Sequence, residues 1–189
     1  MYKNLEKLIE TVRILRSEHG CEWDRAQTHY SLKSNMLEEA YEAVDAIDAG
    51  DLANLREELG DVLLQVLLHS QIADDNGEFN LDDVAKELNN KLIHRHPHVF
   101  GNTKVSSTQD IIDNWDKLKK EEKTDRKSAM DGISKSQAAL MSAQKISKRA
   151  VKQGFEWPNE NSLYECIQSE ITEFKEAETE KDQSHMEEE

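Results

Sequence analysis

The chain has 189 residues and a formal net charge of −15, with 33% charged but only 6% aromatic residues. A chain this acidic should repel a phosphate backbone, which argues against a DNA or RNA polymer as partner. The two isolated cysteines argue against a disulfide framework or zinc site, and the absence of a long apolar run or signal peptide favours a cytoplasmic protein without a membrane span.

Helix breakers are scarce, since only two prolines and seven glycines occur, and this composition favours an all-α fold. Apolar side chains recur every three or four residues from Leu5 to Leu15, which predicts a first amphipathic helix. Gly20 is expected to end this helix. A loop is expected from Cys21 to Tyr30.

Two acidic helices are predicted next, joined by a short turn. The first has Ser34 or Asn35 as candidate cap and runs through Ile47. Asp51 ends the turn and can cap the second helix, which covers residues 55–72. Because the connection is short, the two helices should be antiparallel neighbours.

The second acidic helix is apolar on nearly every side. Its apolar residues are Leu55, Leu59, Val62, Leu63, Leu64, Val66, Leu67, Leu68 and Ile72. Glu58 and Asp61 lie one turn apart within it, and a carboxylate in such a helix loses hydration. A buried basic partner, a bound proton or a hard cation such as Mg²⁺ would neutralise this charge.

The first acidic helix carries Glu38, Glu39 and Glu42 outside its apolar arc. The two helices together can therefore bring four or five carboxylates into one pocket. Such crowded charges repel, and one or two Mg²⁺ ions would relieve the repulsion. The alternative for the three glutamates is a solvated face, because the chain has 39 acidic residues.

Two further helices are predicted over residues 81–94, capped near Asn80, and over residues 111–123. Residues 96–101 interrupt the pattern between them. Histidines occupy three alternate positions there, His94, His96 and His98. Pro97 separates them and no cysteine or carboxylate lies at zinc-finger spacing, so we interpret this segment as a structural loop.

The C-terminal part of the sequence repeats its N-terminal part. Gly20-Cys21-Glu22-Trp23 corresponds to Gly154-Phe155-Glu156-Trp157, and Glu39 and Glu42 correspond to Glu170 and Glu173. The 16-residue spacing from Glu42 to Glu58 recurs from Glu173 to Glu189. A duplicated module explains this pattern better than chance.

We therefore predict a first module over residues 1–125, a polar linker over residues 126–137 and an incomplete second module over residues 138–189. The second copy stops before any counterpart of Asp61, so we expect the natural chain to continue beyond Glu189.

The acidic clusters resemble the signature of the MazG family, EExxE followed by ExxD. The matching residues are Glu38-Glu39-Ala40-Tyr41-Glu42 and Glu58-Leu59-Gly60-Asp61. The resemblance extends over nearly the whole chain, to Cys21–Asp24, Gln27–Thr28, Lys91–Phe100, Trp115, Lys145–Arg149 and Gly154–Trp157. The tandem two-module layout of the family would account for the internal repeat.

The resemblance implies an all-α helical bundle that hydrolyses a nucleoside triphosphate to the monophosphate and pyrophosphate, using Mg²⁺ or, as a substitute, Mn²⁺. It implies Glu38 as a further ligand or the water-activating base. The metal ligands that it implies are Glu39, Glu42, Glu58 and Asp61, with Glu170, Glu173 and Glu189 in the second module.

Five residues are candidates for contact with the nucleotide. Lys91 and Arg95 share a helix face and would clamp phosphates, and Lys119 would reach another phosphate. Trp115 would stack on the base, and Trp23 would cover the nucleotide. The ordinary alternatives are solvated basic residues and tryptophans that pack the fold.

Two residues depart from the family pattern: Ser169 replaces the first Glu of EExxE in the second module, and His94 stands where the family often has Arg. In some family members the second module carries the main activity. Sister all-α enzymes acting on dUTP or phosphoribosyl-ATP are a nearby alternative, but the Gly-x-Glu-Trp and Arg95–Phe100 segments favour MazG.

A rival function of another class is a non-catalytic helical module for dimerisation or for partner or nucleotide binding, with activity in a missing C-terminal half. A homodimer is expected for the enzyme as well, because the apolar helix over residues 55–72 needs to be covered.

Overall fold

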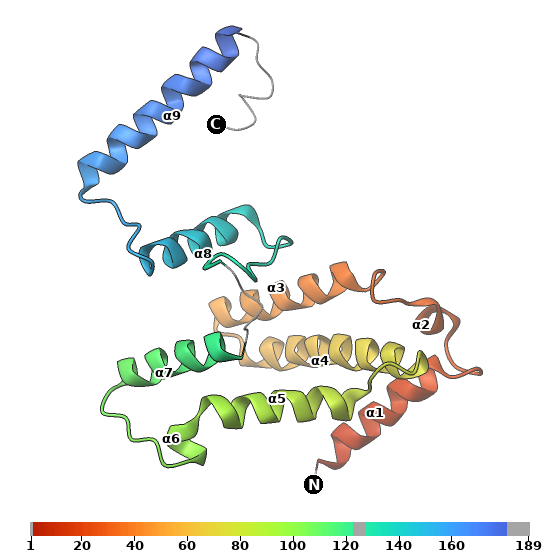
Figure 1. Ribbon diagram of the computed structural model, residues 1–189. Coiled ribbons are helices and arrows are strands. Elements are labelled where there is room, and N and C mark those ends of the chain that lie inside the picture. Colours follow the sequence, from red (N-terminus) through yellow and green to blue (C-terminus); the bar gives the residue numbers. More distant parts are fainter. Residues whose placement is uncertain (1, 123–127, 181–189) are drawn as a thin grey trace. The chain divides into compact units, whose positions relative to one another are not determined.

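The computed structural model describes residues 2–122 and 128–180, and in these ranges all regular structure is helical (Figure 1). The helices are α1 (Lys3–Arg16), α2 (Glu22–Ala26), α3 (Lys33–Ala49), α4 (Leu52–Asp75), α5 (Leu81–Arg95), α6 (Pro97–Phe100), α7 (Thr108–Glu121), α8 (Ala139–Val151) and α9 (Glu160–Glu180). The predicted all-α fold is confirmed.

The chain divides into two compact units, Met1–Leu118 and Lys119–Glu189. The first holds the helices from α1 to α6 and most of α7, and the second holds α8 and α9. The predicted module boundaries at residues 125 and 137 stay predictions.

The helical hairpin of α3 and α4 is the centre of the first unit, where the two helices lie side by side (Figure 1). Gly50 closes the turn with a φ of 67°, a left-handed conformation that glycine adopts without steric cost. Asp51 caps α4, as predicted, because its carboxylate accepts hydrogen bonds from the backbone N–H groups of Ala53 and Asn54 at 3.0 Å.

The predicted cap of α3 is wrong, since neither Ser34 nor Asn35 caps this helix. α3 begins at Lys33, and the N-cap position belongs to Leu32, whose side chain makes no capping bond. A turn before the helix takes over this role, because the Leu32 N–H donates to the Thr28 carbonyl. Leu32 is only 1% exposed, so it anchors the start of α3 in the core.

The core of the first unit joins α1, the start of α3 and the second half of α4. Its buried residues are Val12, Leu32, Leu67, Leu68 and Ile72, with Leu8, Ile9, Leu64 and Leu81 packed against them. α5 also packs on α4, and its predicted start is confirmed by a capping box between Asn80 and Asp83.

The apolar helix predicted over residues 55–72 is buried only in the second half of α4. Leu59 is 54% exposed and Leu63 is 36% exposed, while Glu58 and Asp61 are half-buried. The buried residues of α4 all lie from Gln65 onward, where it meets the core. The first half therefore presents leucines to the surface and keeps its carboxylates beside α3.

Two short helices were not predicted. α2 lies inside the expected loop from Cys21 to Tyr30, and α6 begins at Pro97, which occupies the first helical turn rather than ending a helix. α1 ends at Arg16, ahead of Gly20. A Cβ at Gly20 would collide with the Ile14 and Leu15 carbonyls, so this glycine permits a close approach to the last turn of α1.

Within the described residues, no helix has the length and apolar character that crossing a membrane would require. Cys21 and Cys166 are both free thiols.

Candidate metal and nucleotide site

The hairpin of α3 and α4 brings three of the predicted carboxylates together. Each of Glu39, Glu58 and Asp61 offers one carboxylate oxygen, and these oxygens lie within 4.8 Å of one another. All three side chains are half-buried. Among the described residues, this is the one group of three or more His, Cys, Asp or Glu side chains with such spacing.

Periodicity explains why Glu39 lies in this group. The residues of α3 that lose exposure recur along one stripe: Leu32, Asn35, Glu39, Ala43 and Ala46. This spacing of three and four residues marks the face that packs on α4. The small Ala43 and Ala46 side chains allow the helices to approach closely, and Glu39 lies in the middle of the seam.

The electrostatics of the cluster is unfavourable without a counter-charge. Partial burial raises the pKa of Glu39, and the charges of Asp61, Glu42, Glu58 and Glu38 raise it further. Partial burial likewise raises the pKa of Glu58, followed by the charges of Glu42 and Asp61. These shifts mean that the folded chain resists ionisation of its own cluster.

Glu42 and Glu38 lie at the rim of the cluster. Glu42 is exposed and lies within hydrogen-bonding reach of Glu58. Glu38 is exposed too, and of the four charges that act on Glu39 its effect is the smallest. The structure thus brings all five predicted carboxylates to one place, with three of them at its centre.

A hard divalent cation fits this donor set. Mg²⁺ prefers oxygen ligands and commonly takes carboxylates together with water and substrate phosphates. The three central residues offer only oxygen donors, and a cation would relieve the repulsion that raises their pKa values. Glu39, Glu58 and Asp61 are the residues that would hold such an ion.

Known proteins resemble this chain in sequence and in fold. The family described as MazG nucleotide pyrophosphohydrolase domain matches residues 27–100, from the segment before α3 to the end of α6. A protein of Thermotoga maritima, named nucleoside triphosphate pyrophosphohydrolase/pyrophosphatase MazG, is 45% identical over 97% of this chain and 70% of its own length. The Escherichia coli K12 nucleoside triphosphate pyrophosphohydrolase is 38% identical over 98% of this chain and 72% of its own length.

The chain belongs to the MazG family. The crystal structure of a MazG-related protein from Thermotoga maritima agrees, with a TM-score of 0.51 and 30% identity over 62% of this chain and 98% of that one. The family resemblance and the fold predicted from the sequence are both confirmed.

In this MazG-family chain, two of the residues predicted to contact the nucleotide, Arg95 and Trp115, contact each other. The Arg95 guanidinium lies 5.4 Å from the ring centroid of Trp115, and Arg95 is only 8% exposed. His96 packs its edge on the same ring, at 4.8 Å between centroids. Trp115 thus packs the junction of α5, α6 and α7, and a role in stacking on a base stays a prediction.

The other predicted nucleotide contacts are placed separately. Lys91, one turn before Arg95 on α5, is exposed. Trp23 lies on the short α2 and is 60% exposed, so it does not pack the fold as a core tryptophan would. Lys119 is half-buried near the end of α7, in the second unit.

The predicted site of the second module is only partly described. Glu170 and Glu173 are exposed on α9, where Cys166 donates to Glu170 at 3.7 Å and Ser169 donates to Glu173 at 2.8 Å. Glu189 lies outside the described residues. Metal binding by this second set stays a prediction.

The predicted structural loop at the three histidines is wrong in its backbone, because His94 lies in the last turn of α5 and His98 lies in α6, so that His96 alone stands between the two helices. His96 makes a 2.6 Å hydrogen bond to the Leu92 carbonyl and packs on Trp115. His98 packs against His96, with 5.7 Å between ring centroids.

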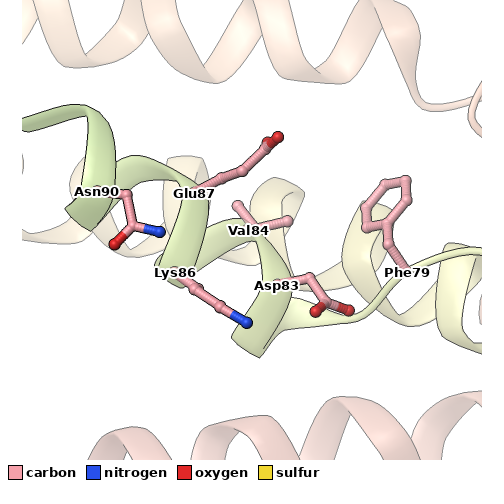
Figure 2. A pocket seen from close by; sticks show the side chains of 6 residues that line it. All are labelled: Phe79, Asp83, Val84, Lys86, Glu87 and Asn90. Carbon is pink, nitrogen blue, oxygen red and sulfur yellow. The ribbon is translucent and has the colours of Figure 1, made fainter.

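A surface pocket lies along α5 and the segment before it (Figure 2). It is lined by Phe79, Asp83, Val84, Lys86, Glu87 and Asn90. None of the predicted metal or nucleotide residues lines it. The acidic seam of α3 and α4, with its convergent oxygens, is the better candidate for chemistry.

The sequence analysis did not single out His29 and His69, which the structure joins. Their Nδ1 atoms are 2.8 Å apart, between the segment before α3 and the second half of α4. The sequence feature that could have pointed to His69 is its position on the second acidic helix, two turns after Asp61 and one turn after Gln65.

Proposed function

We propose that this chain hydrolyses nucleoside triphosphates to the nucleoside monophosphate and pyrophosphate, with Mg²⁺ held between α3 and α4. The reaction class is supported by the match to the MazG nucleotide pyrophosphohydrolase domain and by relatives named for this activity. The observation that carries the metal site is the convergence of the Glu39, Glu58 and Asp61 oxygens within 4.8 Å.

In this reaction, water attacks one of the two phosphorus atoms that flank the α,β-bridging oxygen, and the bond from that phosphorus to the bridging oxygen breaks, which yields the monophosphate and pyrophosphate. When bound, Mg²⁺ would neutralise charge on the triphosphate and lower the pKa of a water at the site. Glu39, Glu58 and Asp61 would hold the ion, with Glu42 completing the set beside Glu58. Glu38 is exposed at the rim, where it can accept the proton of the attacking water.

The phosphates carry negative charge and need basic partners away from the acidic cluster. Lys91 is exposed on α5 and is the first candidate. Arg95 lies over Trp115 and would act on a phosphate only from this stacked position. Mn²⁺, which also prefers oxygen ligands, is expected to substitute for Mg²⁺.

A homodimer is part of this proposal. Large apolar side chains are exposed on α3 and on the first half of α4: Met36, Leu37, Tyr41, Val44, Ile47, Leu59 and Leu63. An apolar surface of this extent on two neighbouring helices is typical of an interface between protein chains. Because most soluble oligomers are symmetric, a second copy is the simplest partner. The compartment that we propose is the cytoplasm, where nucleoside triphosphates, the substrates in the names of the relatives, are found.

The test compares pyrophosphate with orthophosphate release from a panel of NTPs and dNTPs, with and without Mg²⁺. We expect Mg²⁺-dependent pyrophosphate together with the monophosphate. Glu42→Gln and Glu58→Gln should each lower the rate by on the order of 100-fold, since both remove a charge from the metal site. Glu6→Gln is the matched control, because Glu6 is exposed on α1 and belongs neither to the acidic cluster nor to the predicted nucleotide contacts.

Three results would count against the proposal. Release of orthophosphate alone would mean a different reaction, and full activity in both cluster variants would mean a different site. No release together with no effect of Mg²⁺ on thermal stability would favour the non-catalytic binding module.

A further inference from the structure

The His29–His69 contact is an in-line hydrogen bond. The two Nδ1 atoms are 2.8 Å apart, the ring planes differ by 5° and the ring centroids are 5.1 Å apart. This centroid separation is about the largest that two imidazoles can have at such an Nδ1–Nδ1 distance. The rings therefore lie edge to edge in nearly one plane, with the two nitrogens facing each other.

This geometry decides between hydrogen bonding and metal chelation. A shared metal ion would need the two nitrogen lone pairs to converge on a third point, whereas here they lie along one line. One Nδ1 must then carry the proton and donate, while the other accepts. Burial lowers the pKa of His69, and the charge of His29 lowers it further. Burial thus favours the neutral form of His69, and the tautomers of the two rings decide which of them donates.

The remaining ring nitrogen of His69, Nε2, is buried without a partner, and so is Oε1 of Gln65, one turn earlier on α4. An internal water can join two such groups, because water both donates and accepts hydrogen bonds.

The segment that carries His29 is a rigid unit attached to the start of α3. The Thr28 N–H donates to Ser31 Oγ at 2.9 Å, and the Ser31 N–H donates to Thr28 Oγ1 at 3.1 Å. The Ser31 hydroxyl also donates to Gln27 Oε1 at 2.6 Å. Two anchors hold this unit in place: the buried Leu32 in the core and His29 on His69.

Leu32 and His29 restrain the start of α3 in different ways. Burial of Leu32, and of Ala43 and Ala46 further along the seam, is favourable but non-directional, so it restrains the rotation of α3 about its axis less sharply than a directional bond does. A hydrogen bond restricts both distance and angle. A shift of one residue at the start of α3 would turn the whole helix by about 100°. Such a turn would carry Glu39 out of the seam with α4.

We propose that His29 and His69 are positioning residues of the acidic site, whose hydrogen bond sets the register of α3 against α4 and with it the spacing of the three carboxylates. This inference rests on the proposed use of that site to bind Mg²⁺. Neither histidine touches the carboxylates, so both act through the backbone of the hairpin.

The test is the affinity of the full chain for Mg²⁺ alone, measured by calorimetric titration without substrate. His29→Ala removes one partner of the hydrogen bond at an exposed position, so it creates no cavity. We expect it to weaken Mg²⁺ binding by about tenfold, the scale known for groups that orient metal ligands. His69→Leu should have the same effect. His69→Gln, whose amide can still bond to His29, should keep the affinity within about threefold of the unchanged chain.

The double variant His29→Ala/His69→Leu separates positioning from general destabilisation. If the two residues act as one bond, the double variant should bind Mg²⁺ no more weakly than His69→Leu alone. Exposed His19 supplies the control, since His19→Gln should change nothing. Should His69→Leu fail to fold, His29→Ala with His69→Gln carries the comparison.

The inference is overturned if His29→Ala binds Mg²⁺ like the unchanged chain while its melting temperature falls, because the pair would then serve stability alone. Additive losses in the double variant would overturn it as well. A failure of the unchanged chain to bind Mg²⁺ would instead remove the proposed metal site itself, and the inference with it.

Discussion

The crowded carboxylates of Glu39, Glu58 and Asp61 make the metal-free chain less stable than its packing alone would give. The raised pKa values of Glu39 and Glu58 mean that ionisation is less favourable in the folded than in the unfolded state. At neutral pH these groups therefore oppose folding, and the removal of one charge should help the metal-free protein.

Glu58→Gln should consequently raise the melting temperature in the presence of a chelator and reduce the further rise caused by Mg²⁺. Thermal unfolding with EDTA and with Mg²⁺ measures both effects on the same sample. Glu87→Gln controls for the loss of one negative charge from a chain of net charge −15. A lower melting temperature for Glu58→Gln in EDTA would show that this carboxylate already has a stabilising partner.

At the residue scale, the sequence predicted the groups that lie close together on neighbouring helices. Glu58 and Asp61 are one turn apart, and the short turn at Gly50 places Glu39 beside them, so spacing alone was sufficient. The His29–His69 bond joins residues 40 positions apart and belongs to no local pattern. The burial of Arg95 against Trp115 could not be predicted from the sequence either, because it depends on how the chain folds back to place α7 beside the end of α5.

At the element scale, periodicity predicted the long helices and missed the short ones. α2 has five residues and α6 has four, too few to show an apolar repeat. Caps were predicted correctly where a side chain makes the bond, as at Asp51 and Asn80. The prediction failed at the start of α3, because a preceding turn satisfies the backbone there and leaves no side-chain signal.

Gly50 in the hairpin turn and Gly60 inside α4 give a matched pair of stability predictions. A Cβ would meet nothing within 4 Å at either Gly50 or Gly60, so packing contributes to neither substitution. Gly50 has a φ of 67°, and Gly50→Ala should destabilise the fold by about 1 kcal/mol. Gly60 lies inside α4, and Gly60→Ala should stabilise the metal-free chain by up to about 1 kcal/mol.

Urea unfolding in the presence of a chelator measures both changes. A loss of stability in Gly60→Ala would mean that another chain approaches this glycine closely, since the chain itself leaves the space open. Equal effects of the two substitutions would mean that backbone conformation does not govern the turn.

At the scale of the whole molecule, the amount of apolar surface could be predicted from the sequence, but its location could not. The apolar helix over residues 55–72 was expected to need a cover. In the structure its second half is covered by α1 and α5, and the exposed apolar side chains lie instead on α3 and around Leu59 and Leu63. Helical periodicity shows which side of a helix is apolar, but not which neighbour the fold supplies.

The exposed face of α3 leads to the prediction for assembly. Tyr41 is 55% exposed and Val44 is 50% exposed in the single chain, so a lysine at Val44 should cost the monomer little. In a dimer that buries this face, the same lysine would place a charge in an apolar contact, which is unfavourable unless it is paired. Light scattering should give twice the monomer mass of 21.7 kDa for the unchanged chain and the monomer mass for Val44→Lys. Leu140→Lys, at an 82% exposed position of the second unit, should stay dimeric. A monomeric unchanged chain, or a dimer that tolerates Val44→Lys, would show that this face serves another partner.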